Sequence, residues 1–173
     1  MKAKQLASIL SLTFILAGAA LAQDGLSDRV AFEPGTALFS PNELSLDLFG
    51  YHGSRDKGNS PKDAWGPGVG LNYFITQDFG VGADTYADAF VHPYLVNGSA
   101  IFRYPLGDSG LAPYVYAGAG RQWSFAAQWT GHIAGGLEYR FNARTGVFAD
   151  VRRVFAASTE DYTVVRFGFR LAF

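Results

Sequence analysis

The stretch that decides the fold is the last one, Arg166-Phe167-Gly168-Phe169-Arg170-Leu171-Ala172-Phe173, in which apolar side chains alternate with polar or small ones. A period of two is typical of a β-strand, because successive side chains of a strand point to opposite faces. One face of this stretch is wholly apolar, and the other holds two arginines, a glycine and an alanine. The alternation predicts a two-faced strand that ends on an aromatic residue.

The same stretch resembles the C-terminal recognition signal of bacterial outer-membrane β-barrels. That signal consists of a polar residue, a glycine two positions later, a hydrophobic residue and a final aromatic residue, matched here by Arg166, Gly168, Leu171 and Phe173. The resemblance implies insertion by the barrel assembly machinery. It also implies that the rest of the chain supplies a closed barrel.

The beginning of the chain agrees with export. Lys2 and Lys4 precede an apolar run, which ends in Ala20-Leu21-Ala22. This order is typical of a secretory signal peptide cut after Ala22; the alternative, a membrane anchor helix, is disfavoured because the most apolar part of the run is short. We expect a signal peptide over residues 1–22, an irregular periplasmic lead-in over 23–41 and a transmembrane barrel domain over 42–173.

Composition excludes several classes of function. The chain has no cysteine, so disulfides and thiolate metal sites are excluded. Without Lys2 and Lys4 the 14 basic residues become 12, against 15 acidic ones. The chain therefore lacks the excess of basic residues that binding to nucleic-acid phosphates requires. We expect no cofactor and no nucleic-acid partner.

Eight segments between turn signals alternate as two-faced strands require. They are 43–51, 65–74, 79–89, 95–104, 113–122, 129–141, 145–154 and 162–173. An even number of strands returns both ends of the barrel domain to the periplasmic side. On that side, tight connections are expected around 76–78, 106–110 and 142–144. In the fifth segment either of two sets can face lipid, and we favour Val115, Ala117 and Ala119 over Tyr114, Tyr116 and Gly118.

The two predicted faces differ in charge. The lipid-facing positions contain no Asp, Glu or Lys, and a charge at mid-membrane on that face would cost about 2 to 4 kcal/mol. The inward positions carry five acids and five arginines. These are Asp47, Asp84, Asp88, Glu138 and Asp150 with Arg103, Arg140, Arg152, Arg166 and Arg170. Since side chains fill the lumen of an eight-stranded barrel, the balance predicts a paired network that closes it.

The outer end of the predicted barrel offers candidates for surface contacts. Arg121 and Arg153 share the lipid-facing parity near strand ends, which suggests contact with lipopolysaccharide phosphates. The polar loop 52–63 is the predicted site for a surface partner, through His52, Arg55, Asp56, Lys57 and Lys62. Aromatic residues are expected to form girdles at both interfaces. They are Tyr73, Phe74, Phe79, Phe102, Tyr104, Tyr139, Phe141 and Phe173 at the periplasmic side and Trp65, Trp123 and Trp129 at the outer side.

No catalytic motif is complete. The three histidines are scattered without metal-ligand spacing, and the residue two after His132 is Ala134, where the lipid A deacylases carry serine. His52 and Ser54 share a predicted outer loop, as the His and Ser of the palmitoyl-transferring barrels do. Histidine and serine are common in polar loops, so this match is weak evidence for that enzyme class. We therefore expect no enzymatic activity.

The whole exported chain resembles the small OmpA-like and OmpX-like outer-membrane barrels in strand number, loop order, export signal and C-terminal motif. The resemblance implies an all-β fold, an eight-stranded antiparallel up-and-down transmembrane β-barrel in the outer membrane, and a monomer among membrane lipid and lipopolysaccharide. We expect a structural or surface-interaction role. The alternatives are a narrow channel, a lipid A-modifying enzyme and a soluble exported lipocalin-like carrier with the apolar set inside.

Overall fold

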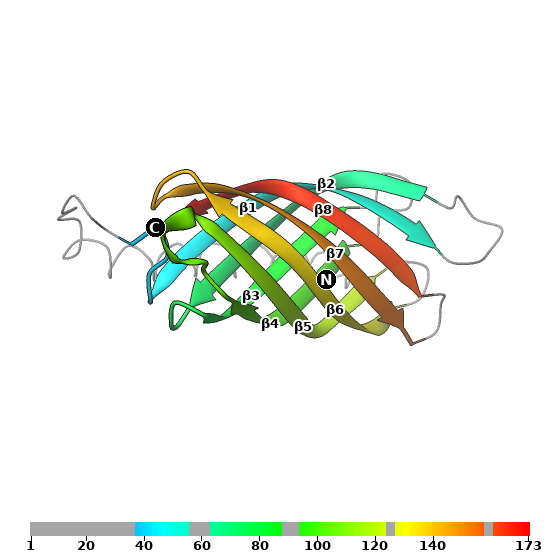
Figure 1. Cartoon of the computed structure of the whole chain (residues 1–173). Helices are drawn as coiled ribbons and strands as arrows, with labels where there is room; N and C mark the ends of the chain where they lie inside the picture. Colours follow the sequence, from blue (N-terminus) through cyan, green and yellow to red (C-terminus); the bar gives the residue numbers. More distant parts are fainter. Residues whose placement is uncertain (1–36, 56–62, 88–93, 124–126, 158–160) are drawn as a thin grey trace, which may run out of the picture. The chain divides into compact units, whose positions relative to one another are not determined.

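The computed structural model describes residues 37–55, 63–87, 94–123, 127–157 and 161–173. Within these ranges the chain forms one closed barrel of eight strands, each hydrogen-bonded to its neighbours in sequence (Figure 1). The predicted antiparallel up-and-down barrel is therefore confirmed. The strands are β1 (Glu43–Arg55), β2 (Asp63–Phe74), β3 (Phe79–Ala87), β4 (Tyr94–Arg103), β5 (Leu111–Trp123), β6 (Ala127–Arg140), β7 (Thr145–Ala156) and β8 (Tyr162–Ala172).

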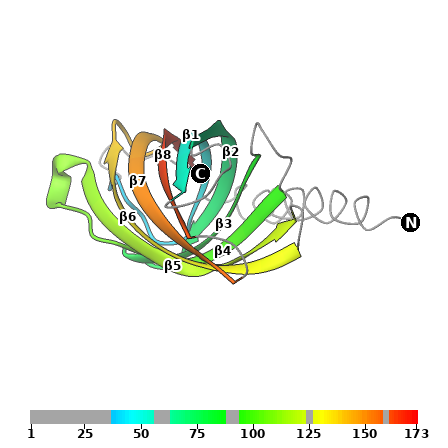
Figure 2. The same cartoon turned by 90° about the vertical axis from the view of Figure 1, so that its right-hand side faces the viewer.

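The barrel closes between its first and last strands. β1 and β8 pair antiparallel, with Leu46 opposite Leu171 and Asp47 opposite Arg170. Beyond the ladder, the Phe173 N–H donates to the Leu44 carbonyl at 2.8 Å. Figure 2 shows the sheet curling until β1 and β8 lie beside each other. The terminal residue thus takes part in the closure.

Short connections gather at one end of the barrel, here named the turn end (Figure 1). They join β2 to β3, β4 to β5 through a 3-10 turn at Gly107–Ser109 (η1), and β6 to β7. The predicted tight connections are confirmed. The opposite end is named the loop end. The described residues contain no helix long and apolar enough to span a membrane.

Several predicted boundaries need correction. β1 continues to Arg55 and β2 begins at Asp63, so His52 and Arg55 belong to a strand and the predicted loop 52–63 was too long. The register pairs Ser54 with Asp63, which extends this hairpin past its apolar part. Three predicted loop residues, Asp56, Lys57 and Lys62, lie outside the described residues. So do the predicted signal peptide, 1–22, and residues 23–36 of the predicted lead-in 23–41.

Candidate functional site

The barrel has an apolar outside and a polar inside. Large hydrophobic side chains are exposed on the outer face, for example Val115 at 55% and Phe169 at 60%. The charged side chains of the opposite parity are buried. This arrangement contradicts the lipocalin-like alternative, which needs the apolar set inside. The fifth strand follows the favoured orientation, because Tyr114 and Tyr116 are buried whereas Val115 is exposed.

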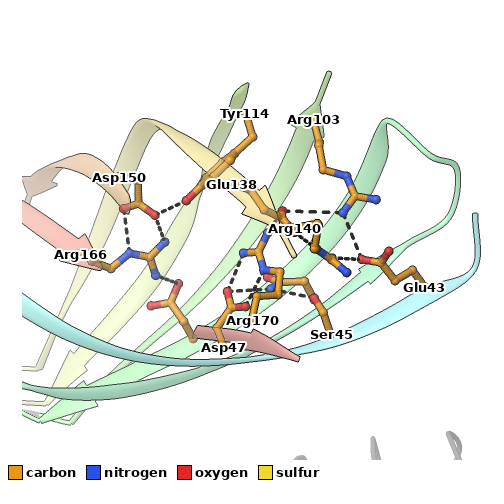
Figure 3. Close-up of polar contacts among 12 residues, drawn as sticks. Glu43, Ser45, Asp47, Arg103, Tyr114, Glu138, Arg140, Asp150, Arg166 and Arg170 are labelled. Carbon is orange, nitrogen blue, oxygen red and sulfur yellow. Dashed lines mark hydrogen bonds and ion pairs between the residues drawn. The ribbon is translucent and has the colours of Figure 1, made fainter. Parts of the chain in front are cut away.

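The first group of lumen charges, named the turn-end cluster, lies near the short turns (Figure 3). It consists of Glu43, Asp47 and Glu138 with Arg103, Arg140 and Arg170. Arg170 holds Asp47 through two hydrogen bonds of 2.6 and 2.7 Å and also contacts Glu138. Glu43 accepts hydrogen bonds from Arg103 at 3.1 Å and from Arg140 at 2.6 Å. Three acids therefore meet three arginines.

Sequence reasoning missed Glu43 as a member of this cluster. Its parity matches that of Ser45 and Asp47, which was an available signal. Because Glu43 begins β1, the alternation gave little reason to treat it as a membrane-embedded position. The side chain is 5% exposed and completes the charge balance of the turn-end cluster.

Aromatic rings enclose the arginine nearest the turns. The Arg103 guanidinium carbon lies 3.7 Å from the Phe74 ring centroid and 4.7 Å from that of Phe39. Phe74, predicted in the interfacial girdle, is instead fully buried, because it shares the inward parity of Asn72. Phe39 precedes β1, within the predicted irregular lead-in, and is only 2% exposed. The last part of that lead-in therefore packs into the turn end.

A second group, named the mid-lumen cluster, consists of Asp84, Asp150, Arg152 and Arg166. Arg166 binds Asp150 through two N–H···O contacts of 2.9 and 2.7 Å, shown in Figure 3. Arg152 donates to Asp84 at 3.0 Å. Two acids meet two arginines, so this cluster is neutral as well. The tenth predicted network residue, Asp88, lies outside the described residues.

Two tyrosines complete the mid-lumen cluster. The hydroxyls of Tyr114 and Tyr116 donate to Asp150 at 2.7 and 3.0 Å. Arg152 in turn donates to the Tyr116 hydroxyl at 3.0 Å. Buried ions are tolerated when both pairing and hydrogen bonding compensate for lost water, and both are present here.

Apolar and aromatic groups separate and cover the charge clusters. Phe148 lies between them, 5.8 Å from the guanidinium carbon of Arg166 and 5.1 Å from that of Arg170. Towards the loop end the lumen contains buried apolar and aromatic side chains, including Tyr51 and Tyr86 with ring centroids 4.6 Å apart. Side chains thus occupy the lumen along the described barrel.

The structure also brings together a serine and a histidine that the sequence analysis did not connect. Ser99 Oγ of β4 and His132 Nε2 of β6 are 2.9 Å apart. Both residues stand opposite Gly118 of β5, where an added Cβ would lie 1.9 Å from the Gly98 carbonyl oxygen. Within the described ranges the His132 Nδ1 atom has no hydrogen-bond partner, so the acid that orients the histidine of a catalytic triad is missing there.

The residues of the predicted assembly signal have different surroundings. Arg166 points into the lumen, where it binds Asp150. Gly168 lies where an added Cβ would come within 2.2 Å of the Leu48 carbonyl oxygen. Leu171 is half-buried and Phe173 is exposed. Two of the four residues thus have structural reasons for their identity within the finished barrel.

The rim at the loop end carries the other predicted contacts. His52 packs on Trp65, with ring centroids 4.2 Å apart, and its Nε2 lies 3.7 Å from Asp63. Arg153 donates to Thr163 at 3.0 Å and lies 3.9 Å from Asp161. Arg121 lies over Trp129, with 5.0 Å between the guanidinium carbon and the ring centroid. The structure keeps these residues on separate strand pairs rather than gathering them in one site.

Comparison with known proteins gives matches in solved structures alone. No protein-family model and no curated protein matches the chain. The N-terminal β-barrel domain of OprF from Pseudomonas aeruginosa matches at 21% identity with a TM-score of 0.63, covering 78% of this chain and 99% of that one. The outer membrane protein OprG of the same organism matches at 12% identity with a TM-score of 0.62, covering 78% and 97%.

A third match is Ail, the attachment invasion locus protein of Yersinia pestis, at 15% identity with a TM-score of 0.54, covering 77% of this chain and 99% of that one. This chain has the fold of the small outer-membrane β-barrels. Each matched barrel is covered almost completely, and each match takes in 77% or 78% of this chain. The predicted OmpA-like architecture is therefore confirmed as a fold.

Proposed function

We propose that this protein is an integral barrel of a bacterial outer membrane with a structural or surface-interaction role. The observation that carries the proposal is the inversion of polarity, with an apolar outer face and paired charges inside. An apolar outer face is stable in lipid, where all backbone groups must bond within the barrel. Membrane insertion follows from this arrangement together with the fold.

The proposed barrel does not conduct ions. Both charge clusters balance internally, and aromatic side chains occupy the levels beside them. The test is refolding into lipid vesicles, followed by conductance measurements in a planar bilayer. Heat-modifiable insertion with electrical silence supports the proposal, whereas steady conductance steps favour the narrow channel. Failure to insert at all contradicts membrane residence.

The surface role is assigned to the loop end. The matched Ail is named as an attachment protein, and one of its structures is a complex with the heparin analogue sucrose octasulfate. By analogy we propose that the connection from β1 to β2 carries the specific contact through Asp56, Lys57 and Lys62, together with Arg55 and His52 of the preceding strand. Replacing residues 56–62 with a glycine-serine linker is expected to abolish binding to cell-surface polyanions while the barrel still folds.

The remaining parts of the proposal concern export and surroundings. Residues 1–22 act as the signal peptide, and Arg166, Gly168, Leu171 and Phe173 present the strand to the barrel assembly machinery. Arg121 and Arg153 contact lipopolysaccharide, and the barrel works as a monomer without a catalytic role. Deleting Phe173 in cells tests the assembly step, since accumulation of unassembled protein in the periplasm is the expected result.

A further inference from the structure

Thr130 and His132 of β6 each carry a buried polar atom to which no described residue forms a hydrogen bond. Thr130 is 3% exposed and His132 is 4% exposed, and both lie on the inward face of the strand. The two atoms are Thr130 Oγ1 and His132 Nδ1. Buried polar groups in native proteins are nearly always bonded to protein or to ordered solvent. Two such atoms on one face of one strand therefore indicate a ligand.

Four inward polar side chains of β4 and β6 flank two glycines of β5. We name them the polar quartet, which comprises Asn97, Ser99, Thr130 and His132. Gly118 lies between Ser99 and His132, and these two side chains meet across it, with Oγ and Nε2 2.9 Å apart. Gly120 lies between Asn97 and Thr130, and an added Cβ there would come within 2.2 Å of Asn97 Oδ1. The quartet is thus built across a strand that contributes no side chain.

The charges beside the quartet are already paired. Asp84 accepts hydrogen bonds from Asn97 at 2.9 Å and from Arg152 at 3.0 Å. Both charged residues belong to the neutral mid-lumen cluster. A ligand with a net charge would lose its water here and find no free counter-charge, which is costly in a buried site. The quartet therefore suits an uncharged ligand.

The hydrogen-bonding capacity of the quartet narrows the chemistry further. A neutral imidazole has one N–H donor and one acceptor nitrogen, and Ser99 occupies Nε2 of His132. The other nitrogen, Nδ1, donates in one tautomer and accepts in the other, and the Thr130 hydroxyl can do both. A hydroxyl group satisfies either arrangement. Inward positions two apart on a strand are separated by about 7 Å, so one hydroxyl can bond to both side chains.

Uncharged polar side chains continue from the quartet towards the loop end. Gln128 stands two residues before Thr130 and is paired with Gln122 in the β5–β6 ladder. The Gln128 amide donates to the Gln122 amide oxygen at 3.4 Å, and both residues are buried. Towards the turn end the mid-lumen cluster follows, since Arg152 stands opposite Ala134. A neutral hydroxyl compound would therefore approach from the loop end.

We infer that the polar quartet binds the hydroxyl group of a neutral molecule, held by Thr130 Oγ1 and His132 Nδ1. The molecule is water or a small polyol, which offer the same donor and acceptor. The inference goes beyond the proposed function, because it depends on the closed lumen and not on a surface partner.

Thr130→Val tests the site, because it removes the hydroxyl and keeps the shape of the side chain. If the hydroxyl is bonded to a ligand, the equilibrium constant for unfolding in urea should rise about fivefold. The matched control is Thr85→Val, the same change at a half-buried outward position of β3, which should not raise this constant. A Thr130 variant that unfolds no more readily than the control would overturn the inference, since removing an unbonded buried hydroxyl costs nothing.

Nuclear magnetic resonance of the refolded full chain with nitrogen-15-labelled histidine identifies the ligand. Cross-relaxation between water protons and the His132 ring that weakens in Thr130→Val would assign water to the site. A shift of the His132 signals that saturates with added glycerol and is lost in Thr130→Val would assign a polyol. Either result supports the inference. Absence of both signals, or a shift with sodium chloride that glycerol does not reproduce, would contradict a site for a neutral hydroxyl.

Discussion

Arg170 binds two carboxylates of the turn-end cluster at once. It bonds to Asp47 across the β1–β8 closure and to Glu138 from β6. The residue therefore links the first, sixth and last strands. Removing one partner from a buried ion cluster costs more than the cluster contributes to stability, because the remaining charge has lost water and gains nothing in return.

Arg170→Leu is expected to lower the free energy of unfolding by about 3 to 5 kcal/mol, since it leaves Asp47 uncompensated. Urea unfolding of vesicle-embedded protein measures the loss. The double variant with Asp47→Leu removes both charges and should lose less than the two single variants summed. Strict additivity would contradict the coupling.

Gly168→Ala tests a close approach between strands. The new Cβ would lie 2.2 Å from the Leu48 carbonyl oxygen, so backbone must shift, and the expected loss is about 1 to 3 kcal/mol in the same unfolding assay. Gly98→Ala is the control, because its added Cβ meets nothing within 4 Å and should change stability by less than about 0.5 kcal/mol. Similar losses for both would refute the steric explanation.

At the scale of the element, β7 shows how far two faces of one strand can differ. Val151 is 53% exposed, whereas its neighbours Asp150 and Arg152 are buried and paired. The outward side needs an apolar residue because it meets lipid, and the inward side tolerates charge only with partners. A charge on the outer face should therefore cost more at mid-strand than at the rim.

Val151→Lys is expected to cost about 2 to 4 kcal/mol, whereas Trp129→Lys near the loop end should cost no more than about 1 kcal/mol for its charge. The comparison uses refolding yield and urea unfolding in vesicles of fixed composition. In detergent micelles, which adapt to a charge, the difference should shrink. Equal costs at both heights would contradict the proposed position of the membrane.

The segment before β1 acts as part of the fold. Phe39 is 2% exposed and lies against Arg103 and Arg140 at the turn end. Phe39→Ala is expected to lower the free energy of unfolding by about 3 kcal/mol, the lower range for an aromatic side chain removed from a core. Ala37→Ser, at an exposed position, is the control. An unchanged stability would show that this packing adds nothing.

Alternation in the sequence predicted the elements well for a physical reason. Each strand has one lipid-like and one paired-charge face, so the period of two is strong in segments such as the one containing Val147, Ala149 and Val151. The ends of the strands were harder to predict than their middles. β1 continues through polar residues such as His52 and Ser54, which pair with β2 although the apolar–polar alternation has already ended there. Phe74 was wrongly predicted to lie in the aromatic girdle because it stands at the end of a strand. Its position in the alternation is that of an inward-facing residue, and its side chain is buried.

At the scale of the whole molecule, the site could be predicted in composition but not in pairing. Which acid meets which arginine depends on the register of strands far apart in sequence, such as Asp47 with Arg170. The same applies to Ser99 and His132, which meet across β5 because both lie opposite Gly118. No local pattern records a contact made over an intervening strand.

The buried position of the charges predicts a low sensitivity to salt. Ions in solution screen exposed charge pairs, whereas pairs such as Arg166 with Asp150 have little contact with water. The free energy of unfolding should change by less than about 0.5 kcal/mol between low and physiological salt. A steep loss of stability with added sodium chloride, measured in neutral lipid, would place the stabilising pairs on the surface.

The neutrality of the two clusters has a consequence for assembly order. Each cluster takes one of its arginines from β8, Arg170 in one and Arg166 in the other. A sheet that lacks β8 therefore has one surplus carboxylate in each cluster, facing a lumen that is not yet sealed. The missing positive charges come from Arg166 and Arg170 when β8 pairs with β1. Closure of the barrel therefore seals the lumen and neutralises both clusters in the same step.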